Sequence, residues 1–104
     1  MIARIWHGWS MDEKADAYER LVSEEVLPSI HRIDGFVGYE LFRADSDDGE
    51  SEFVTVTYFE SLEAVRAFAG EDYELAVVPP EARELLTRFD ERSRHYEVLA
   101  KTSG

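Results

Sequence analysis

The chain has 104 residues, of which 44% are hydrophobic and none is cysteine. This length fits one domain and excludes a second core of comparable size. The balance of 11 Lys and Arg against 23 Asp and Glu gives a formal charge of −12, which repels nucleic-acid phosphates and anionic lipid surfaces, so neither nucleic acid nor a membrane is expected as a partner. The absence of cysteine excludes disulfides, iron–sulfur clusters and thiolate nucleophiles.

The first expected elements are a strand and a long helix. Ile2–Trp9 mixes β-branched, aromatic and polar residues without helical spacing, which predicts a strand. Ser10 and Glu13 have the spacing of a capping box, so a helix is expected to begin at Met11. Its apolar side chains recur every three or four residues, and Pro28 is expected to end it.

The second half of the chain predicts a hairpin, a helix and a last strand. Two segments rich in β-formers flank the turn-rich Asp45–Glu50. Ser61 can cap a second helix, which is expected to stop near Gly70. Pro79 and Pro80 break the chain before one or two further helical turns. The remaining expected ranges are 36–42 and 52–59 for the hairpin strands, 81–89 for the helical turns and 95–100 for the last strand.

This order of elements predicts an α+β, ferredoxin-like βαββαβ fold, in which two helices pack on one face of a four-stranded antiparallel sheet. Residues 1–100 are expected to form this single domain, and 101–104 a polar tail. Bulky side chains occur on several strands and would leave an uncovered sheet face costly in water, so a homodimer is expected. These side chains are Trp6, Phe42, Tyr58 and Tyr96.

The pattern resembles the antibiotic biosynthesis monooxygenase family. The resemblance rests on Phe59–Phe68 after a strand, the following Pro79-Pro80 pair, Phe89 and a closing His95–Val98, and it spans nearly the whole chain. It implies a dimeric α+β barrel whose protomers each hold a pocket between helices and sheet. It also implies a choice of chemistries, which are cofactor-independent oxidation of aromatic polyketides, quinol oxidation and haem degradation.

The resemblance disfavours the haem-degrading branch. That branch has an Asn on the first strand, a Trp on the second helix and a His beyond it that binds iron. The matching places here hold Trp6 or His7, Phe68 and Val78, so the usual axial ligand is missing, and His7 or His95 would have to approach the iron from another strand. The polyketide-oxidising branch finds loose counterparts in Trp6 or Trp9, Tyr73, and Arg66 or Arg83.

His7 and His95 are the predicted catalytic bases. They lie on the first and last strands, which are antiparallel neighbours in this topology, so their rings could approach one another or flank one pocket. A neutral histidine there could deprotonate an acidic phenol. The alternative is that both are ordinary hydrogen-bonded strand residues. Glu97 shares a strand face with His95, so these two residues and His7 could form a two-histidine, one-carboxylate metal site. No metal is expected, because the family that the chain resembles does not need one.

Trp6, Trp9, Phe68 and Tyr73 are the predicted substrate-binding walls, with plain core packing as the alternative. The leading functional prediction is a cofactor-independent monooxygenase that acts with O₂ on a small aromatic or quinol-like molecule. The alternatives are a non-catalytic dimeric binding domain and a haem-binding or haem-degrading protein. No stretch suits a signal peptide or a membrane span, so a cytoplasmic location is expected.

Overall fold

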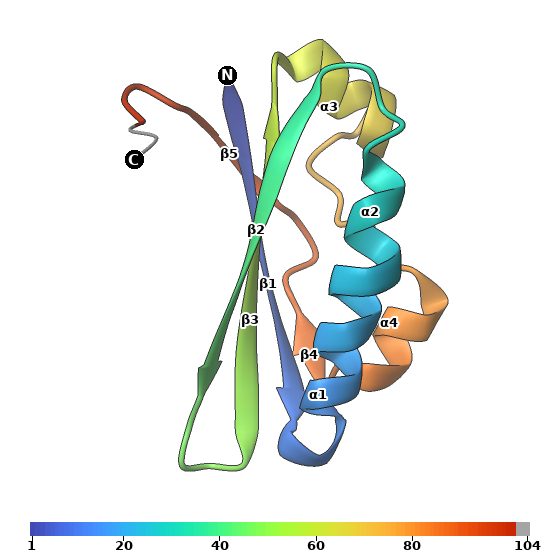
Figure 1. The fold of residues 1–104 in the computed structure, drawn as a ribbon, viewed down its shortest axis with the longest axis vertical. Coiled ribbons are helices and arrows are strands. Elements are labelled where there is room, and N and C mark those ends of the chain that lie inside the picture. The colour runs from blue at the N-terminus through green and yellow to red at the C-terminus, as the bar shows by residue number, and fades with distance from the viewer. Residues whose placement is uncertain (102–104) are drawn as a thin grey trace.

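A computed structural model describes residues 1–101, and the predicted tail therefore falls largely outside the described part. The chain alternates strands with helices, and the helices lie together on one side of the sheet (Figure 1). Its elements are β1 (Ile2–Met11), α1 (Asp12–Leu21), η1 (Val22–Val26), α2 (Leu27–Ile30), β2 (Phe36–Asp45), β3 (Glu50–Phe59), α3 (Leu62–Ala69), α4 (Pro80–Leu85), β4 (Arg88–Phe89) and β5 (Arg94–Glu97).

The sheet confirms the predicted ferredoxin-like α+β class. Its strand order is β2-β3-β1-β4, all pairings are antiparallel, and β5 also pairs with β1. The predicted fourth strand is thus divided, because β4 pairs with Gly8 and Trp9 whereas β5 pairs with residues 2–5 of β1. The expected helical range 81–89 was too long, since α4 ends at Leu85 and the chain then becomes extended.

The capping box predicted at Ser10 does not form. Strand β1 continues to Met11, and α1 begins at Asp12 without a side-chain cap. Ser10 is fully buried, and its hydroxyl donates to the Leu85 carbonyl at 2.7 Å instead. The tertiary hydrogen bond to the end of α4 therefore replaces the local one that the spacing suggested.

Pro28 does not end the first helix, contrary to the prediction. The helical path widens into the π-helix η1 just before the proline and continues as α2 to Ile30. A proline removes one backbone donor and crowds the carbonyl four residues earlier, and a wider turn relieves that crowding. The Ser61 cap is confirmed, because its side chain accepts from the Ala64 N–H at 3.2 Å, and Gly70 ends α3 with φ 93°.

The core lies between the helices and one face of the sheet. Phe53 and Phe59 project from β3 toward the helices and are fully buried. Tyr18 of α1 packs on Phe53 with 4.7 Å between ring centroids. Trp6 also lies on this covered face, because it is paired with Thr55 two positions from Phe53, so it does not belong to the open face as its bulk suggested.

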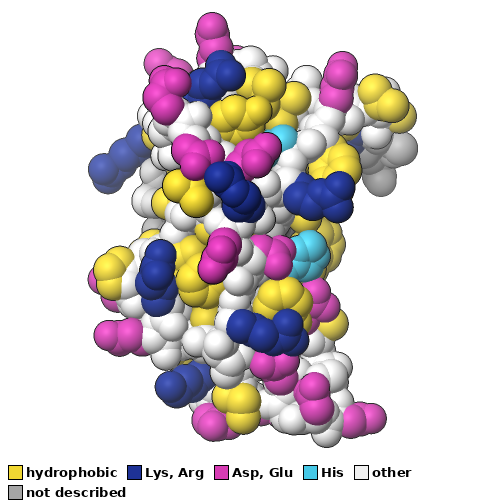
Figure 2. Space-filling model, turned by 180° about the vertical axis from the view of Figure 1, so that it is seen from behind, with side chains coloured by type: hydrophobic (Ala, Val, Ile, Leu, Met, Phe, Trp, Pro, Cys, Tyr) yellow, Lys and Arg dark blue, Asp and Glu magenta, His cyan; other side chains and the backbone are white. Residues whose placement is uncertain are grey.

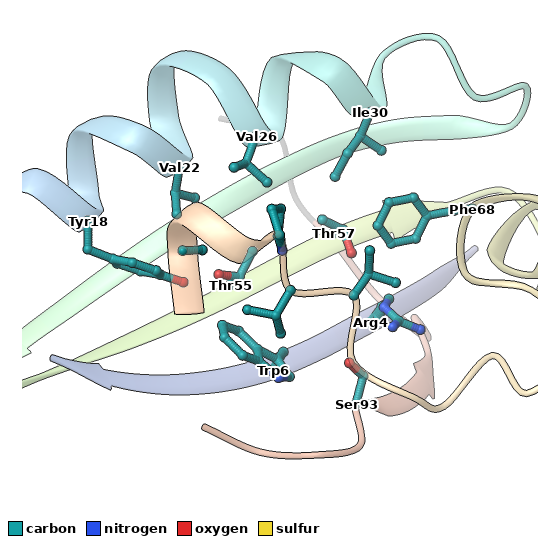
Figure 3. Close-up of a pocket in the computed structure, with 14 residues that line it drawn as sticks. Arg4, Trp6, Tyr18, Val22, Val26, Ile30, Thr55, Thr57, Phe68 and Ser93 are labelled. Carbon is teal, nitrogen blue, oxygen red and sulfur yellow. The ribbon is translucent and has the colours of Figure 1, made fainter. Parts of the chain in front are cut away.

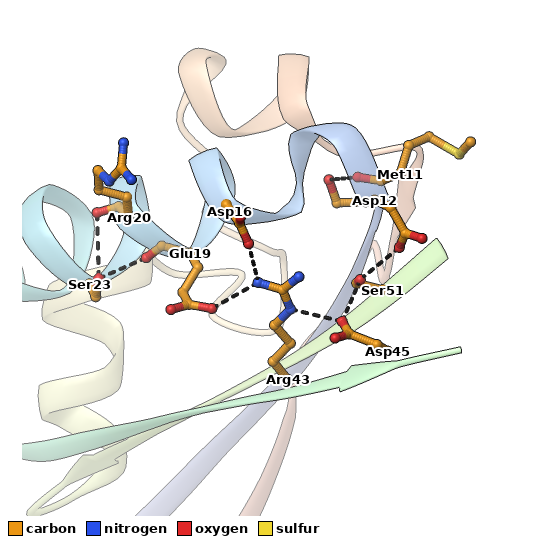
Figure 4. Close-up of polar contacts among 10 residues, drawn as sticks. Met11, Asp12, Asp16, Glu19, Arg20, Ser23, Arg43, Asp45 and Ser51 are labelled. Atoms are coloured by element: carbon orange, nitrogen blue, oxygen red, sulfur yellow. Dashed lines mark hydrogen bonds and ion pairs between the residues drawn. The ribbon is translucent and has the colours of Figure 1, made fainter. Parts of the chain in front are cut away.

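Arg43 of β2 fastens α1 to the edge of the sheet. Its Nη1 contacts carboxylates of Asp16 at 2.7 Å and Glu19 at 3.0 Å, and its Nε donates to Asp45 at 2.8 Å (Figure 4). Asp45 also accepts from the Ser51 hydroxyl at 2.7 Å. These hydrogen bonds, first that of Arg43, hold the pKa of Asp45 below its usual value. The network links α1 to the edge strand β2 at the surface.

The surface carries its charges in mixed order. On the side opposite to the view of Figure 1, basic side chains lie among acidic ones rather than in a block (Figure 2). Arg92 contacts Asp72 at 3.1 Å and Glu74 at 3.6 Å, and Arg88 contacts Glu50 at 3.0 Å. No helix within residues 1–101 has the length and apolar character needed to cross a membrane.

Candidate active site

A cavity of about 70 Å³ lies between the helices and the sheet. Its floor comes from β1 and β3, its roof from α1 to α2, and one side from the segment 77–79 that leads into α4 (Figure 3). Its lining residues are Arg4, Trp6, Tyr18, Val22, Val26, Ile30, Thr55, Thr57, Phe68, Val77, Val78, Pro79, Ala82 and Ser93. Apolar walls with a few polar groups are typical of a small-molecule site.

Arg4 is the buried cation of this cavity. Its position on β1 shares a face with Trp6, and it is 4% exposed. The guanidinium donates to the carbonyls of Tyr73 and, at 2.9 Å, Leu75. It forms no ion pair with a carboxylate of residues 1–101. Burial lowers the pKa of Arg4 to about 10, so the group remains cationic at neutral pH.

His95 supports Arg4 from β5. The two residues are direct partners across the sheet, and the His95 Nε2 lies 2.9 Å from the Arg4 Nη1. The imidazole also meets the ring of Tyr73 edge-on at 5.0 Å between centroids. Burial and then the charge of Arg4 lower the pKa of His95, against an opposing effect of Glu74. A neutral His95 therefore accepts a hydrogen bond from Arg4 at neutral pH.

The two predicted bases do not meet, so that expectation was wrong. His7 lies at an odd position of β1 and His95 opposite an even one, which places them on opposite faces of the sheet. The His7 Nδ1 lies 3.0 Å from an Asp90 carboxylate oxygen, and its Nε2 lies 4.0 Å from Glu52. The metal triad drawn with Glu97 is excluded by the same alternation. Residues 1–101 hold no group of three or more potential metal ligands.

The predicted walls divide between the two faces. Trp6 and Phe68 line the cavity, and the Trp6 indole N–H donates to the Asp90 carbonyl at 2.7 Å. Trp9 lies on the open face. Its ring stacks with that of His7, with 6.1 Å between the centroids, and the Arg88 Cζ lies 4.0 Å from the centroid of the Trp9 ring. Tyr73 does not line the cavity, but its carbonyl accepts a hydrogen bond from Arg4 and its ring packs edge-on against His95.

Several lining residues were not found by sequence reasoning. Arg66 and Arg83 were considered as the functional arginines, but they lie over the rings of Tyr73 and Phe89, each at 5.3 Å. Arg4 has a signal in the sequence, because it shares the strand face of Trp6 two positions away. The hydroxyl-bearing lining residues carry no comparable signal, since alternating threonines are ordinary in strands. These are Tyr18, Thr55, Thr57 and Ser93.

The comparisons with known proteins fit this geometry. A family model described as antibiotic biosynthesis monooxygenase matches residues 10–79, which is more than half of the chain. The chain therefore belongs to the antibiotic biosynthesis monooxygenase family, as the resemblance implied. Among proteins with curated functions, none matches the sequence significantly.

Solved structures share the fold over nearly the whole chain. Rv0793 of Mycobacterium tuberculosis is 22% identical with a TM-score of 0.66, and the match covers 98% of each chain. MhuD of the same organism, a haem degrader with two haems in its active site, is 19% identical with a TM-score of 0.68, covering 99% of this chain and 100% of MhuD. A Streptomyces coelicolor monooxygenase in complex with nanaomycin D is 17% identical with a TM-score of 0.57, covering 99% and 90%.

The lowered pKa of His95 predicts a measurable loss of stability in mild acid. The unfolded chain takes up the proton near the ordinary histidine pKa of about 6.5, before the folded chain does. The free energy of unfolding should therefore fall as the pH drops from about 6.5 through the lower folded value. His95→Gln keeps an acceptor for Arg4 without titrating, so this part of the acid loss should vanish.

Melting temperatures of both proteins between pH 8 and 5, with an NMR titration of the wild-type imidazole, test this prediction. A His95 midpoint at or above about 6.5 would contradict it.

Proposed function

We propose that this protein is a cofactor-independent monooxygenase that oxidises a small aromatic or quinol-like molecule with O₂. The observation that carries the proposal is Arg4, a cation without a carboxylate partner in residues 1–101, at the wall of an aromatic-lined cavity. Such a cation favours a bound ligand that is negatively charged. Membership of the monooxygenase family and the fold of the nanaomycin D complex support the same reading.

The reaction balances without an external reductant. Loss of the phenol proton gives a phenolate, which passes one electron to O₂. The resulting radical and superoxide join at a ring carbon to form a hydroperoxide, and cleavage of its O–O bond releases water and leaves a carbonyl. Overall, one phenol and one O₂ give one quinone and one water, and all four electrons come from the substrate.

Arg4 has the main electrostatic role in this proposal. Its charge stabilises both the phenolate and the superoxide, because a preorganised cation in a dry site acts more strongly than one in water. His95 holds the guanidinium in place from β5 and acts as a positioning residue, because its Nε2 is engaged by Arg4 and it does not line the cavity. Trp6 and Phe68 are the walls against which a flat ring would pack.

Substrate entry requires the cavity to widen. A volume of about 70 Å³ holds water molecules, whereas a dry cavity that admits benzene measures about 150 Å³. The wall most easily displaced is the irregular segment 77–79, which joins no strand and is partly exposed. We infer that this segment moves outward when an aromatic ligand binds.

We also propose that the protein is a homodimer joined through the open face of the sheet. Phe42 on β2 is 49% exposed, Tyr96 on β5 is 44% exposed, and both lie on the face that the helices leave uncovered. An apolar face of this kind is costly in water.

Sedimentation equilibrium should give twice the chain mass, and Phe42→Glu should give a folded monomer. A monomeric wild-type protein would refute the dimer. The cytoplasmic location stays a prediction.

Oxygen consumption tests the proposed reaction. We expect wild-type protein to consume one O₂ per molecule of an electron-rich phenol and to place one atom of ¹⁸O₂ in the quinone. Arg4→Met should lower the rate about 100-fold or more, the scale of losing a preorganised electrostatic group. Arg4→Lys should retain part of the rate, and Arg20→Gln, on the exposed side of α1, should retain all of it.

Three outcomes distinguish the alternatives. Uptake that depends on Arg4 supports the monooxygenase. Stabilisation by phenols without oxygen uptake would contradict it and indicate a binding domain. A Soret band that grows on haem titration, with haem breakdown, would contradict it in favour of haem chemistry. None of the cavity-lining residues in the described chain is a histidine.

A further inference from the structure

Tyr18 presents its phenol hydroxyl to the cavity. The residue is 2% exposed, yet its hydroxyl makes no hydrogen bond within residues 1–101. Every fully enclosed side-chain nitrogen or oxygen in that range has a partner, so this hydroxyl must be open to the cavity rather than sealed in the core. A ligand in the cavity can therefore accept a hydrogen bond from this hydroxyl in place of water.

The phenol is held in place and remains a donor. Its ring packs on Phe53 with 4.7 Å between centroids and an interplanar angle of 57°. The helix that carries it is fastened by Arg43, which contacts Asp16 and Glu19 on either side of Tyr18 in sequence. Burial raises the pKa of Tyr18, so the group stays protonated throughout the neutral range.

The cavity has two polar ends. The hydroxyls of Tyr18 and Thr55 lie at one end, and Arg4 and Thr57 lie at the other (Figure 3). Thr55 and Thr57 are two residues apart on β3, which is about 7 Å along a strand and comparable to a benzene ring with its substituents. Trp6, paired with Thr55 across the sheet, supplies an aromatic surface beside the Tyr18 end.

We propose that Tyr18 determines specificity by donating a hydrogen bond to a second oxygen of the substrate, opposite the oxygen that faces Arg4. Among the aromatic substrates of the proposed function, Tyr18 therefore selects a ring that carries a second oxygen opposite the first. This inference rests on the cavity of the proposed function, and it adds a group that neither the family match nor the chemistry of deprotonation requires.

Anaerobic calorimetry tests the proposal, because binding is then measured without turnover. The probes are hydroquinone and phenol, which differ only in the second hydroxyl. Wild-type protein should bind hydroquinone about 3- to 10-fold more tightly, the scale of one neutral hydrogen bond. Tyr18→Phe removes only the hydroxyl oxygen and should bring hydroquinone to the affinity of phenol, while phenol binding stays unchanged.

Controls keep the test sharp. Tyr39→Phe, whose ring packs beside Phe36 outside the cavity lining, should keep the wild-type preference. In wild-type protein, 4-methoxyphenol should retain an advantage over 4-methylphenol, because Tyr18 donates and a methoxy oxygen accepts.

Equal affinities of wild-type protein for hydroquinone and phenol would overturn the inference, and so would an equal loss of both in Tyr18→Phe. A protein that prefers hydroquinone but never consumes O₂ would overturn the proposed function and leave the role of Tyr18 supported.

Discussion

The arrangement of the cavity depends on one buried charge. The Arg4 guanidinium is withdrawn from water, and its hydrogen-bond partners are two backbone carbonyls and the neutral ring of His95. These contacts engage both terminal nitrogens of the guanidinium without neutralising its charge. They also tie three parts of the chain together, since β1 carries Arg4, β5 carries His95, and the carbonyls belong to the segment after α3. The same interaction that closes the fold beside the cavity leaves a positive potential inside it.

The alternation of β1 distributes side chains between two tasks. Even positions, which include Arg4 and Trp6, face the helices and contribute to the cavity, while odd positions, which include His7 and Trp9, face the uncovered side. His7 therefore lies on the uncovered face, although its neighbour in the sequence, Trp6, lies on the covered one. The uncovered side carries apolar groups suited to a second protomer, and the covered side carries those suited to a ligand.

Sequence patterns predicted the fold class well, because the order of elements and the Ser61 cap are local features. They failed at Ser10 and Pro28, where a tertiary hydrogen bond and a π-helix replaced the expected local outcome. For the site, Trp6 and Phe68 were predicted as walls and do line the cavity. Whether His7 and His95 share a face depends on the strand register, and a shift of one residue would reverse the answer. The segment after α3, which contributes the carbonyls that bind Arg4, has no periodic pattern from which its structure could be predicted.

The pKa of a bound phenol is the most direct measure of the positive potential on which this account depends. A pH titration of the absorbance of 4-nitrophenol, free and bound to saturating protein, gives the value without any turnover. The account predicts that binding lowers the pKa of the probe by at least about one unit and that Arg4→Met abolishes the shift. An unchanged or raised pKa in the wild-type complex would contradict it, because the cavity would then disfavour the anion on which the proposed oxidation depends.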